Sequence, residues 1–196
     1  YIVIAQVKQI FGAASNSALT NIREALRTAP VHSFSMENLK AVRFTGDRSL
    51  RCTAEEIDSM FDTYEIGAYT FMLLSLLYPN LKYSQKGFHQ DHMHPYTGFE
   101  ESKIKGLVFP DGTVIDDETK ENWRRRRNTL ANLQLLEGRE NESKNDTPLV
   151  DWLKVAENRE NAKYLPSCIS YELSNFEEFM EKRQELMSKA LKEILL

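Results

Sequence analysis

The chain has 196 residues, with 25 basic against 29 acidic side chains and a formal net charge of −4. This length suits one domain of ordinary size, or a small core with an added layer. The acidic balance excludes a globally basic nucleic-acid-binding protein, although a local basic groove can act within an acidic chain. The two cysteines, Cys52 and Cys168, are far apart, which excludes a Cys-x-x-Cys zinc site and a disulfide framework. We therefore expect a protein of the reducing cytoplasm.

The start of the chain shows no targeting signal. It begins at Tyr1 rather than Met, and Ile2-Val3-Ile4 lacks the charged leader of a signal peptide. We expect the chain to be a piece of a longer protein. The most apolar run, from Ala68 to Tyr78, is too short to span a bilayer and is typical of a buried helix. No membrane association is expected.

Residues 1–83 show mainly helical periodicity. We expect four helices: one from about Ile4 to Gly12, one from Ser17 to before Pro30, one after a Thr53-x-x-Glu56 capping box, and one over Ala68–Tyr78. The segment between the second and third helices is mixed. Its aromatic residues Phe34 and Phe44 are predicted to lie in the core.

After Gly87 the pattern changes to short extended segments. Phe88 to His94, which precedes Pro95, fits a strand that delivers its end to a site. Residues 96–117 are loop-rich and are expected to loop out, with a hairpin around Asp111-Gly112 at 108–115. Leu130 to Leu136 predicts a second strand, which is followed by a turn at Gly138.

Two further helices are expected in the last third of the chain. One follows Asp146-Thr147-Pro148, with the proline at its first helical position. The other is capped by Ser174 or Asn175 and carries an apolar stripe from Phe176 to Ile194.

The residues capable of chemistry gather in three short motifs. Asp91 directly precedes His92 in the first strand, Asn132 lies in the second, and Asn141 and Lys144 follow it. A carboxylate oxygen can hold a hard cation, and a neutral imidazole can accept a proton near neutral pH. The motifs together predict one site that holds a metal ligand and a general base.

The order Asp-His-x-x-Pro, Asn-Leu-x-x-Leu, Asn-x-x-Lys resembles that of HNH (His-Me finger) nucleases. The resemblance implies a ββα-metal centre in which Asp91 and Asn141 bind Mg²⁺ or Mn²⁺. His92 would be the general base, and Asn132 would orient the loop or the imidazole by backbone hydrogen bonds. Lys144, one helical turn beyond Asn141, would face the same side and meet a phosphate.

The remaining histidines leave alternatives open. In an extended strand His92 and His94 point to the same face, and His89 points to the other. His94 then either assists substrate or metal binding, or packs against the loop. A zinc site formed by His92, His94 and an acid is the rival centre, although oxygen ligands from Asp and Asn suit magnesium better.

Four consecutive arginines, Arg124, Arg125, Arg126 and Arg127, precede the second motif. Such a run is a solvated face in most proteins. A guanidinium group matches phosphate oxygens bidentately, however, and this run leads directly into the segment that carries Asn132. We expect at least one of the four to contact DNA.

The resemblance extends over most of the chain, to the C-terminal half of GmrSD-type modification-dependent restriction proteins. It is carried by Leu73-Leu74-Ser75-Leu76-Leu77-Tyr78, the three HNH motifs, and Asn175-Phe176-Glu177-Glu178-Phe179 with Lys182-Arg183. It implies a DNA endonuclease directed against phage, working with an N-terminal nucleotide-hydrolysing domain. The Asp-Gly-Gln-Gln-Arg motif of that domain does not occur in this sequence.

The sequence thus predicts a mostly helical α+β fold in three parts. These are a helical layer over 1–83, a ββα-metal nuclease core over 84–158 with an insertion at 96–127, and a long C-terminal helix within 159–196. The predicted function is metal-dependent cleavage of DNA phosphodiesters. The alternatives are a non-catalytic DNA-binding or assembly module that keeps the finger fold, and an HNH-type RNase.

Overall fold

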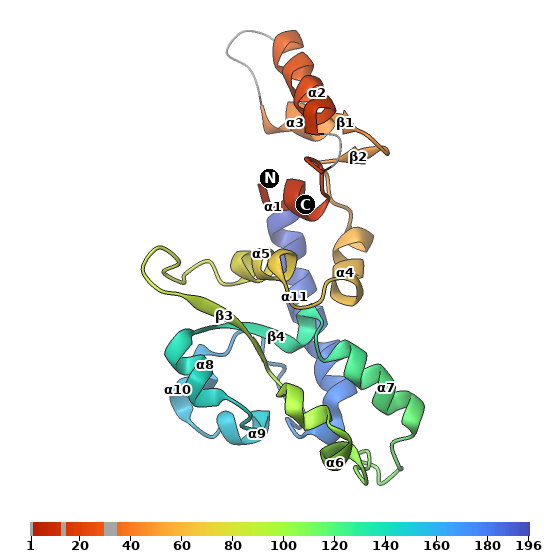
Figure 1. Ribbon diagram of the computed structural model, residues 1–196, viewed down its shortest axis with the longest axis vertical. Coiled ribbons are helices and arrows are strands. Elements are labelled where there is room, and N and C mark those ends of the chain that lie inside the picture. Colours follow the sequence, from red (N-terminus) through yellow and green to blue (C-terminus); the bar gives the residue numbers. More distant parts are fainter. Residues whose placement is uncertain (1, 13–14, 30–34) are drawn as a thin grey trace. The chain divides into compact units, whose positions relative to one another are not determined.

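The computed structural model describes residues 2–12, 15–29 and 35–196 (Figure 1). Within these ranges the protein is α+β and mostly helical, with two small antiparallel sheets of two strands each, which confirms the predicted fold class. The backbone forms two compact units, residues 1–57 with 192–196, and residues 58–191. The boundaries differ from the predicted three parts. Residues 58–77 and most of the C-terminal helix belong to the same unit as the two strands within residues 84–158.

The first unit contains short elements around a small core. They are α1 (Ile2–Val7), α2 (Ser15–Thr28), α3 (Met36–Ala41), β1 (Arg43–Phe44) and β2 (Arg48–Ser49). Strands β1 and β2 form a hairpin, and Phe44 is buried in a core with Ile4, Ile10 and Leu50. The two predicted helices and the predicted burial of Phe44 are therefore confirmed, although α1 ends at Val7 rather than near Gly12. Phe34 lies outside the described residues.

Helix α4 (Ala54–Thr63) begins at the predicted capping box. The Thr53 hydroxyl accepts a hydrogen bond from the Glu56 amide at 3.2 Å, and the Glu56 carboxylate accepts one from the Thr53 amide at 2.9 Å. Helix α5 (Ala68–Leu77) is the expected buried helix, because it is apolar on nearly all sides. Its residues Leu73, Leu74 and Leu77 expose at most 2% of their surface.

A β-β-α arrangement forms the centre of the second unit. Strand β3 (Phe88–His92) pairs antiparallel with β4 (Leu133–Glu137), and α8 (Gly138–Lys144) follows β4 without a break (Figure 1). The predicted turn at Gly138 is therefore wrong. Gly138 is the first helical residue, because Glu137 caps the helix in a capping box with Glu140.

Strand β3 ends at His92, two residues earlier than predicted. The next amide, Met93 N, donates to the carbonyl of Asn132 at 2.7 Å, and η2 (Leu130–Asn132) precedes β4 where a continuous strand was expected. This turn of the backbone decides where His94 points.

The segment between the two strands folds onto the core rather than looping out. It contains η1 (Tyr96–Phe99), α6 (Glu101–Ile104) and α7 (Asp117–Arg126), and the expected hairpin is a single bridge between Val108 and Val114. Phe99 and Trp123 are fully buried, and their rings lie 4.8 and 5.5 Å from the ring of Phe176. The prediction of an excluded insertion is wrong, because its aromatic side chains complete the core.

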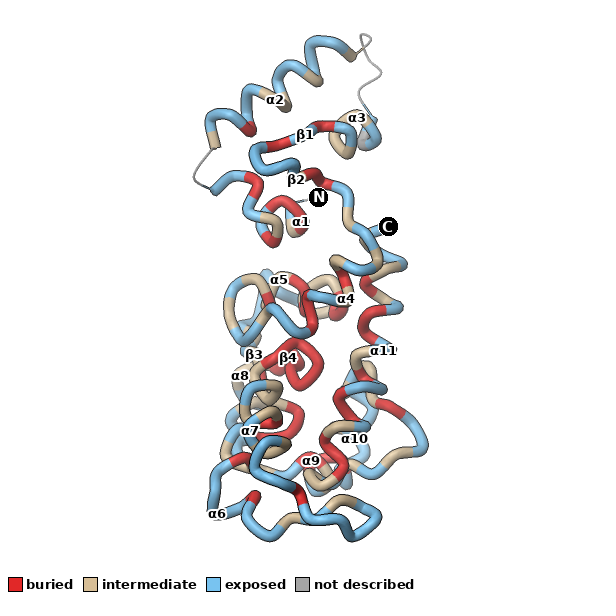
Figure 2. The backbone as a smooth tube through the Cα atoms, turned by 90° about the vertical axis from the view of Figure 1, so that its right-hand side faces the viewer, coloured by how far each residue is buried: buried red, intermediate tan, exposed pale blue. Residues whose placement is uncertain are grey.

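The chain ends in α9 (Leu149–Trp152), α10 (Ala156–Asn161), η3 (Leu173–Asn175) and α11 (Phe176–Leu195). Pro148 is the N-cap of α9, whereas the sequence predicted it at the first helical position. The predicted stripe of α11 is buried from Phe176 to Leu191, and Figure 2 shows buried residues along β4 and one side of α11. None of the helices in the described ranges has the length and apolarity needed to cross a lipid bilayer.

The capping box of α4 gives a test of local stability. Thr53→Ala should lower the free energy of unfolding by about 1 kcal/mol, because it removes the acceptor for the Glu56 amide. Urea denaturation followed by circular dichroism measures the change. Thr63→Ala is the matched control, since that hydroxyl bonds a carbonyl one turn earlier at the far end of the helix. A loss at Thr63 as large as that at Thr53 would contradict the capping role.

Candidate active site

His92 lies at the end of β3 and is half-buried. Its Nε2 is 3.0 Å from the side-chain oxygen of Asn128, which can only accept a hydrogen bond. The proton of the neutral ring therefore resides on Nε2, and Nδ1 is left as the acceptor. Burial lowers the pKa of His92, against the opposing effects of Asn128 and Asp91, and Lys144 and Arg127 lower it further. His92 is therefore neutral at pH 7, as a general base must be.

Asn132 fixes the backbone on both sides of the site. Its side chain is fully buried, and its Oδ1 accepts from the amide of His94 at 2.9 Å. Its Nδ2 donates to the carbonyls of His94 at 3.1 Å and Arg127 at 2.8 Å. These are backbone hydrogen bonds of the kind predicted for Asn132. They join the loop after His92 to the segment that enters β4.

Asp91 and Lys144 form a buried ion pair between β3 and α8. Asp91 Oδ2 lies 3.0 Å from Lys144 Nζ and 2.8 Å from Nε2 of Gln134, its cross-strand neighbour on β4. Lys144 also donates to the carbonyl of His92. Burial lowers the pKa of Lys144, whereas Asp91 raises it. With no exposed surface, Lys144 does not fit the predicted contact with a phosphate; it holds the helix on the strand.

Two residues of this arrangement, Asp91 and Asn141, carry oxygen atoms of the kind that a hard divalent cation binds. Asp91 Oδ2 is taken by Gln134 and Lys144, whereas Oδ1 has no hydrogen-bond partner among the described residues. Asn141 lies one turn before Lys144 on α8, and therefore on the side of the helix that meets β3. A carboxylate oxygen oriented by such contacts, together with an amide oxygen, suits Mg²⁺ or Mn²⁺.

His94 does not face the site. It is 2% exposed, and its ring packs edge-on against Phe179 at 4.7 Å and Phe176 at 5.5 Å. The predicted role of His94 in substrate binding does not fit this position. The alternation of side chains ends with β3 at His92, so His94 turns into the core. Across the described residues no three His, Cys, Asp or Glu side chains gather, and the rival zinc site does not form there.

The four arginines have different surroundings at the end of α7, where Arg127 is the C-cap residue. Arg124 pairs with Glu101 and donates to the carbonyl of Phe99 at 3.2 Å, which does not fit contact with DNA. Arg125 is exposed and Arg126 is half-buried. Arg127 stacks on Tyr96, with its guanidinium carbon 3.6 Å from the ring centroid.

Of the four arginines, Arg127 is the one whose charge lowers the pKa of His92. The ring on which it stacks, that of Tyr96, lies 5.9 Å from the ring of His92. A guanidinium held in this way places a positive charge beside the imidazole, where it can attract a phosphate.

The sequence motifs did not predict three neighbours of the site: Asn128, Gln134 and Tyr96. Gln134 lies opposite Asp91 only because of the strand register, and Asn128 and Tyr96 come from the intervening segment. The one signal in the sequence was the position of Gln134, two residues after Asn132 in the second motif.

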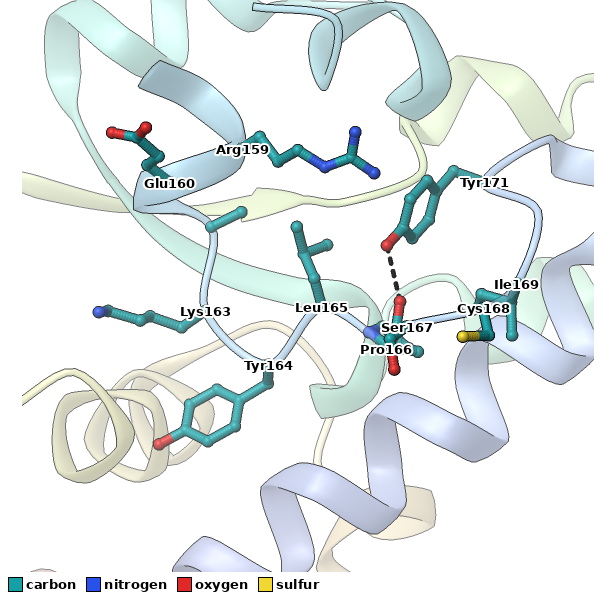
Figure 3. Close-up of a pocket in the computed structure, with 11 residues that line it drawn as sticks. Arg159, Glu160, Lys163, Tyr164, Leu165, Pro166, Ser167, Cys168, Ile169 and Tyr171 are labelled. Carbon is teal, nitrogen blue, oxygen red and sulfur yellow. Dashed lines mark hydrogen bonds between the residues drawn. The ribbon is translucent and has the colours of Figure 1, made fainter. Parts of the chain in front are cut away.

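A separate cavity of about 580 Å³ lies in the same unit, lined by residues 159–171 (Figure 3). Its lining includes none of the residues predicted for the site. In Figure 3 Arg159 extends toward the ring of Tyr171, whereas Tyr164 points away from both.

Comparison with models of protein families finds no match to the chain, and comparison with curated proteins finds no match either.

Replacement of His94 should change the response of stability to acid. Burial lowers the pKa of His94 from 6.5 to about 3. As the pH falls below 6.5, the unfolded chain takes up a proton that the folded chain excludes, so stability is lost. His94→Phe should reduce the drop in unfolding free energy between about pH 7 and about pH 5, measured with urea. His89→Phe, at an exposed position of β3, is the control. An unchanged acid response in His94→Phe would contradict the assignment.

Proposed function

We propose that this chain is a metal-dependent endonuclease that hydrolyses DNA phosphodiester bonds at an HNH-type centre. One observation carries the proposal: Lys144 of α8 bonds both Asp91 and the His92 carbonyl at the end of β3. The contact joins the first motif to the third, and the pairing of β3 with β4 brings the Asn132 segment beside them. Asp91 and His92 at the end of β3, followed by Asn141 on α8, have the order that the HNH resemblance implies, which supports the proposal.

His92 has the properties needed to activate water. Asn128 holds the Nε2 proton, which leaves Nδ1 free to accept a proton from the attacking water. The imidazolium formed in this way keeps its hydrogen bond to Asn128. General-base catalysis of this kind contributes about 10²–10⁴-fold to the rate.

Asp91 and Asn141 would hold Mg²⁺ or Mn²⁺. The bound cation would neutralise charge on the scissile phosphate and on the leaving oxygen. Arg127 adds a fixed positive charge beside His92, and Tyr96 restrains its guanidinium group. Asn132 and Lys144 act as positioning residues, since their hydrogen bonds hold the backbone on either side of His92.

The biological role that we propose is restriction of phage DNA. The similarity in motif order to GmrSD-type proteins supports a nuclease that restricts modified phage DNA. In that case selectivity would come from an accompanying nucleotide-hydrolysing domain, because a centre that grips phosphates reads few base edges.

His92→Ala should lower the cleavage rate by about 10²–10⁴-fold and leave the fold intact. A nicking assay on plasmid DNA with circular dichroism measures both. His89→Ala, at an exposed position of the same strand, should cleave at the wild-type rate. Because burial lowers the pKa of His92 below 6.5, the acid limb of the wild-type pH–rate profile should have its midpoint below 6.5. Wild-type cleavage by folded His92→Ala would exclude the general base.

Removal of the divalent cation tests whether cleavage requires it. EDTA should stop cleavage, and Mg²⁺ or Mn²⁺ should restore it. Asn141→Ala should weaken binding of Mn²⁺, measured by calorimetry, whereas Glu142→Ala at the exposed neighbouring position should bind Mn²⁺ as the wild type does. Cleavage that persists undiminished in EDTA would remove the cation from the mechanism.

A further inference from the structure

We propose that the cavity lined by residues 159–171 binds an unpaired nucleotide of a nucleic-acid strand. The inference rests on the proposed function, because it assigns a second contact for the same class of substrate. The cavity, of about 580 Å³, lies within the size range of small-molecule sites, about 300–1,000 Å³.

The charges of the cavity favour an anion. Arg159 and Lys163 are both exposed, and neither has a carboxylate partner among the described residues. Glu160 is the acid in the same lining, so basic groups outnumber acidic ones. Two free cations at one cavity provide counter-charges for a phosphate backbone.

The walls favour a base. Arg159 lies 5.7 Å from the centroid of the Tyr171 ring, and the side chain of Leu165 lines the cavity beside them (Figure 3). Aromatic rings and guanidinium planes stack on bases without regard to sequence. A base inside a duplex cannot reach such walls, so the occupant must be unstacked or single-stranded.

The cavity is held in shape before any ligand binds. The Tyr171 hydroxyl donates to the Pro166 carbonyl at 2.6 Å, which fixes the ring. The Tyr164 hydroxyl donates to the carbonyl of Leu77 at 3.0 Å and ties the loop to the end of α5. Preorganised walls spare the ligand the entropic cost of ordering them.

A neighbouring cavity favours a nucleic-acid strand over a free nucleotide as the ligand. Lys163 and Tyr164 also line a second cavity of about 250 Å³, which is bounded by residues 77–81. The two cavities therefore share Lys163 and Tyr164 in their walls. An extended polyanion can occupy both, with a phosphate at Lys163, whereas a free nucleotide would fill one.

Cys168 provides a readout that is independent of cleavage. Its thiol is exposed and lines the cavity, whereas Cys52 is partly buried in the other unit. Alkylation by iodoacetamide can be followed at both residues by mass spectrometry, in EDTA so that the DNA stays intact. A single-stranded DNA oligonucleotide should slow alkylation of Cys168 several-fold and leave Cys52 unchanged. The same sequence as a duplex, deoxynucleoside monophosphate and inorganic phosphate should each protect less at equal concentration.

Matched variants test the contacts of Lys163 and Tyr171 separately. Lys163→Gln should weaken protection and lower the salt slope of log K by about 0.7, whereas Lys189→Gln, an exposed lysine of α11, should leave both unchanged. Tyr171→Leu should weaken protection by about fivefold or more through loss of one stacked base. Tyr171→Phe should weaken it less, because it keeps the ring and loses only the hydrogen bond to Pro166.

Three results would overturn the proposal: no protection of Cys168 by the single strand, equal protection of both cysteines, or equal protection by duplex or free nucleotide. Failure here is distinguishable from failure of the nuclease proposal. If the cavity binds DNA, the single strand should still protect Cys168 in the His92→Ala variant. If the cavity does not bind DNA, the wild-type protein should still show cleavage that depends on His92.

Discussion

The ion pair between Asp91 and Lys144 is the contact on which the candidate site depends. Both charges are withdrawn from water, and such a pair is favourable only when further hydrogen bonds compensate its desolvation. Gln134 and the His92 carbonyl supply those bonds, one from each strand. Removal of either partner would leave a buried charge without compensation, at a cost of about 3–5 kcal/mol. The pair therefore stabilises one placement of α8 against β3, and with it the distance between Asn141 and Asp91.

Two other buried polar side chains extend this arrangement into the core. Asn132 bonds the backbone at His94 and Arg127, and Arg183 of α11 donates to the carbonyls of Ala131 and Leu133 at 2.6 and 2.9 Å. The carbonyls around η2 lie at a break between helix and strand, where the ladder does not satisfy them. Side chains from distant parts of the chain take over those bonds. The site is consequently built on backbone that the core holds rigidly.

The electrostatics of the site follow from this burial. Lys144 and Arg127 lower the pKa of His92, and Lys144 and Arg183 lower that of His94. Burial is the main cause that keeps His92 neutral, and the two cations add to it against the opposing effect of Asp91. In the proposed function, the same Arg127 charge would attract a phosphate.

The sequence by itself determined several of the elements and the order of the motifs. Periodicity predicted α2, α5 and α11, the Thr53 capping box predicted the start of α4, and Asp91-His92 lay on a strand as expected, because these signals are local. Tertiary structure decided which of the marked residues meet. Strand register placed Gln134 opposite Asp91, and the early end of β3 turned His94 into an aromatic core. Packing gave Arg124 a partner in Glu101 and placed Arg127 on the ring of Tyr96. Lys144 was marked for a phosphate and is buried instead, because the direction of a side chain depends on what packs against its helix, which no local pattern contains.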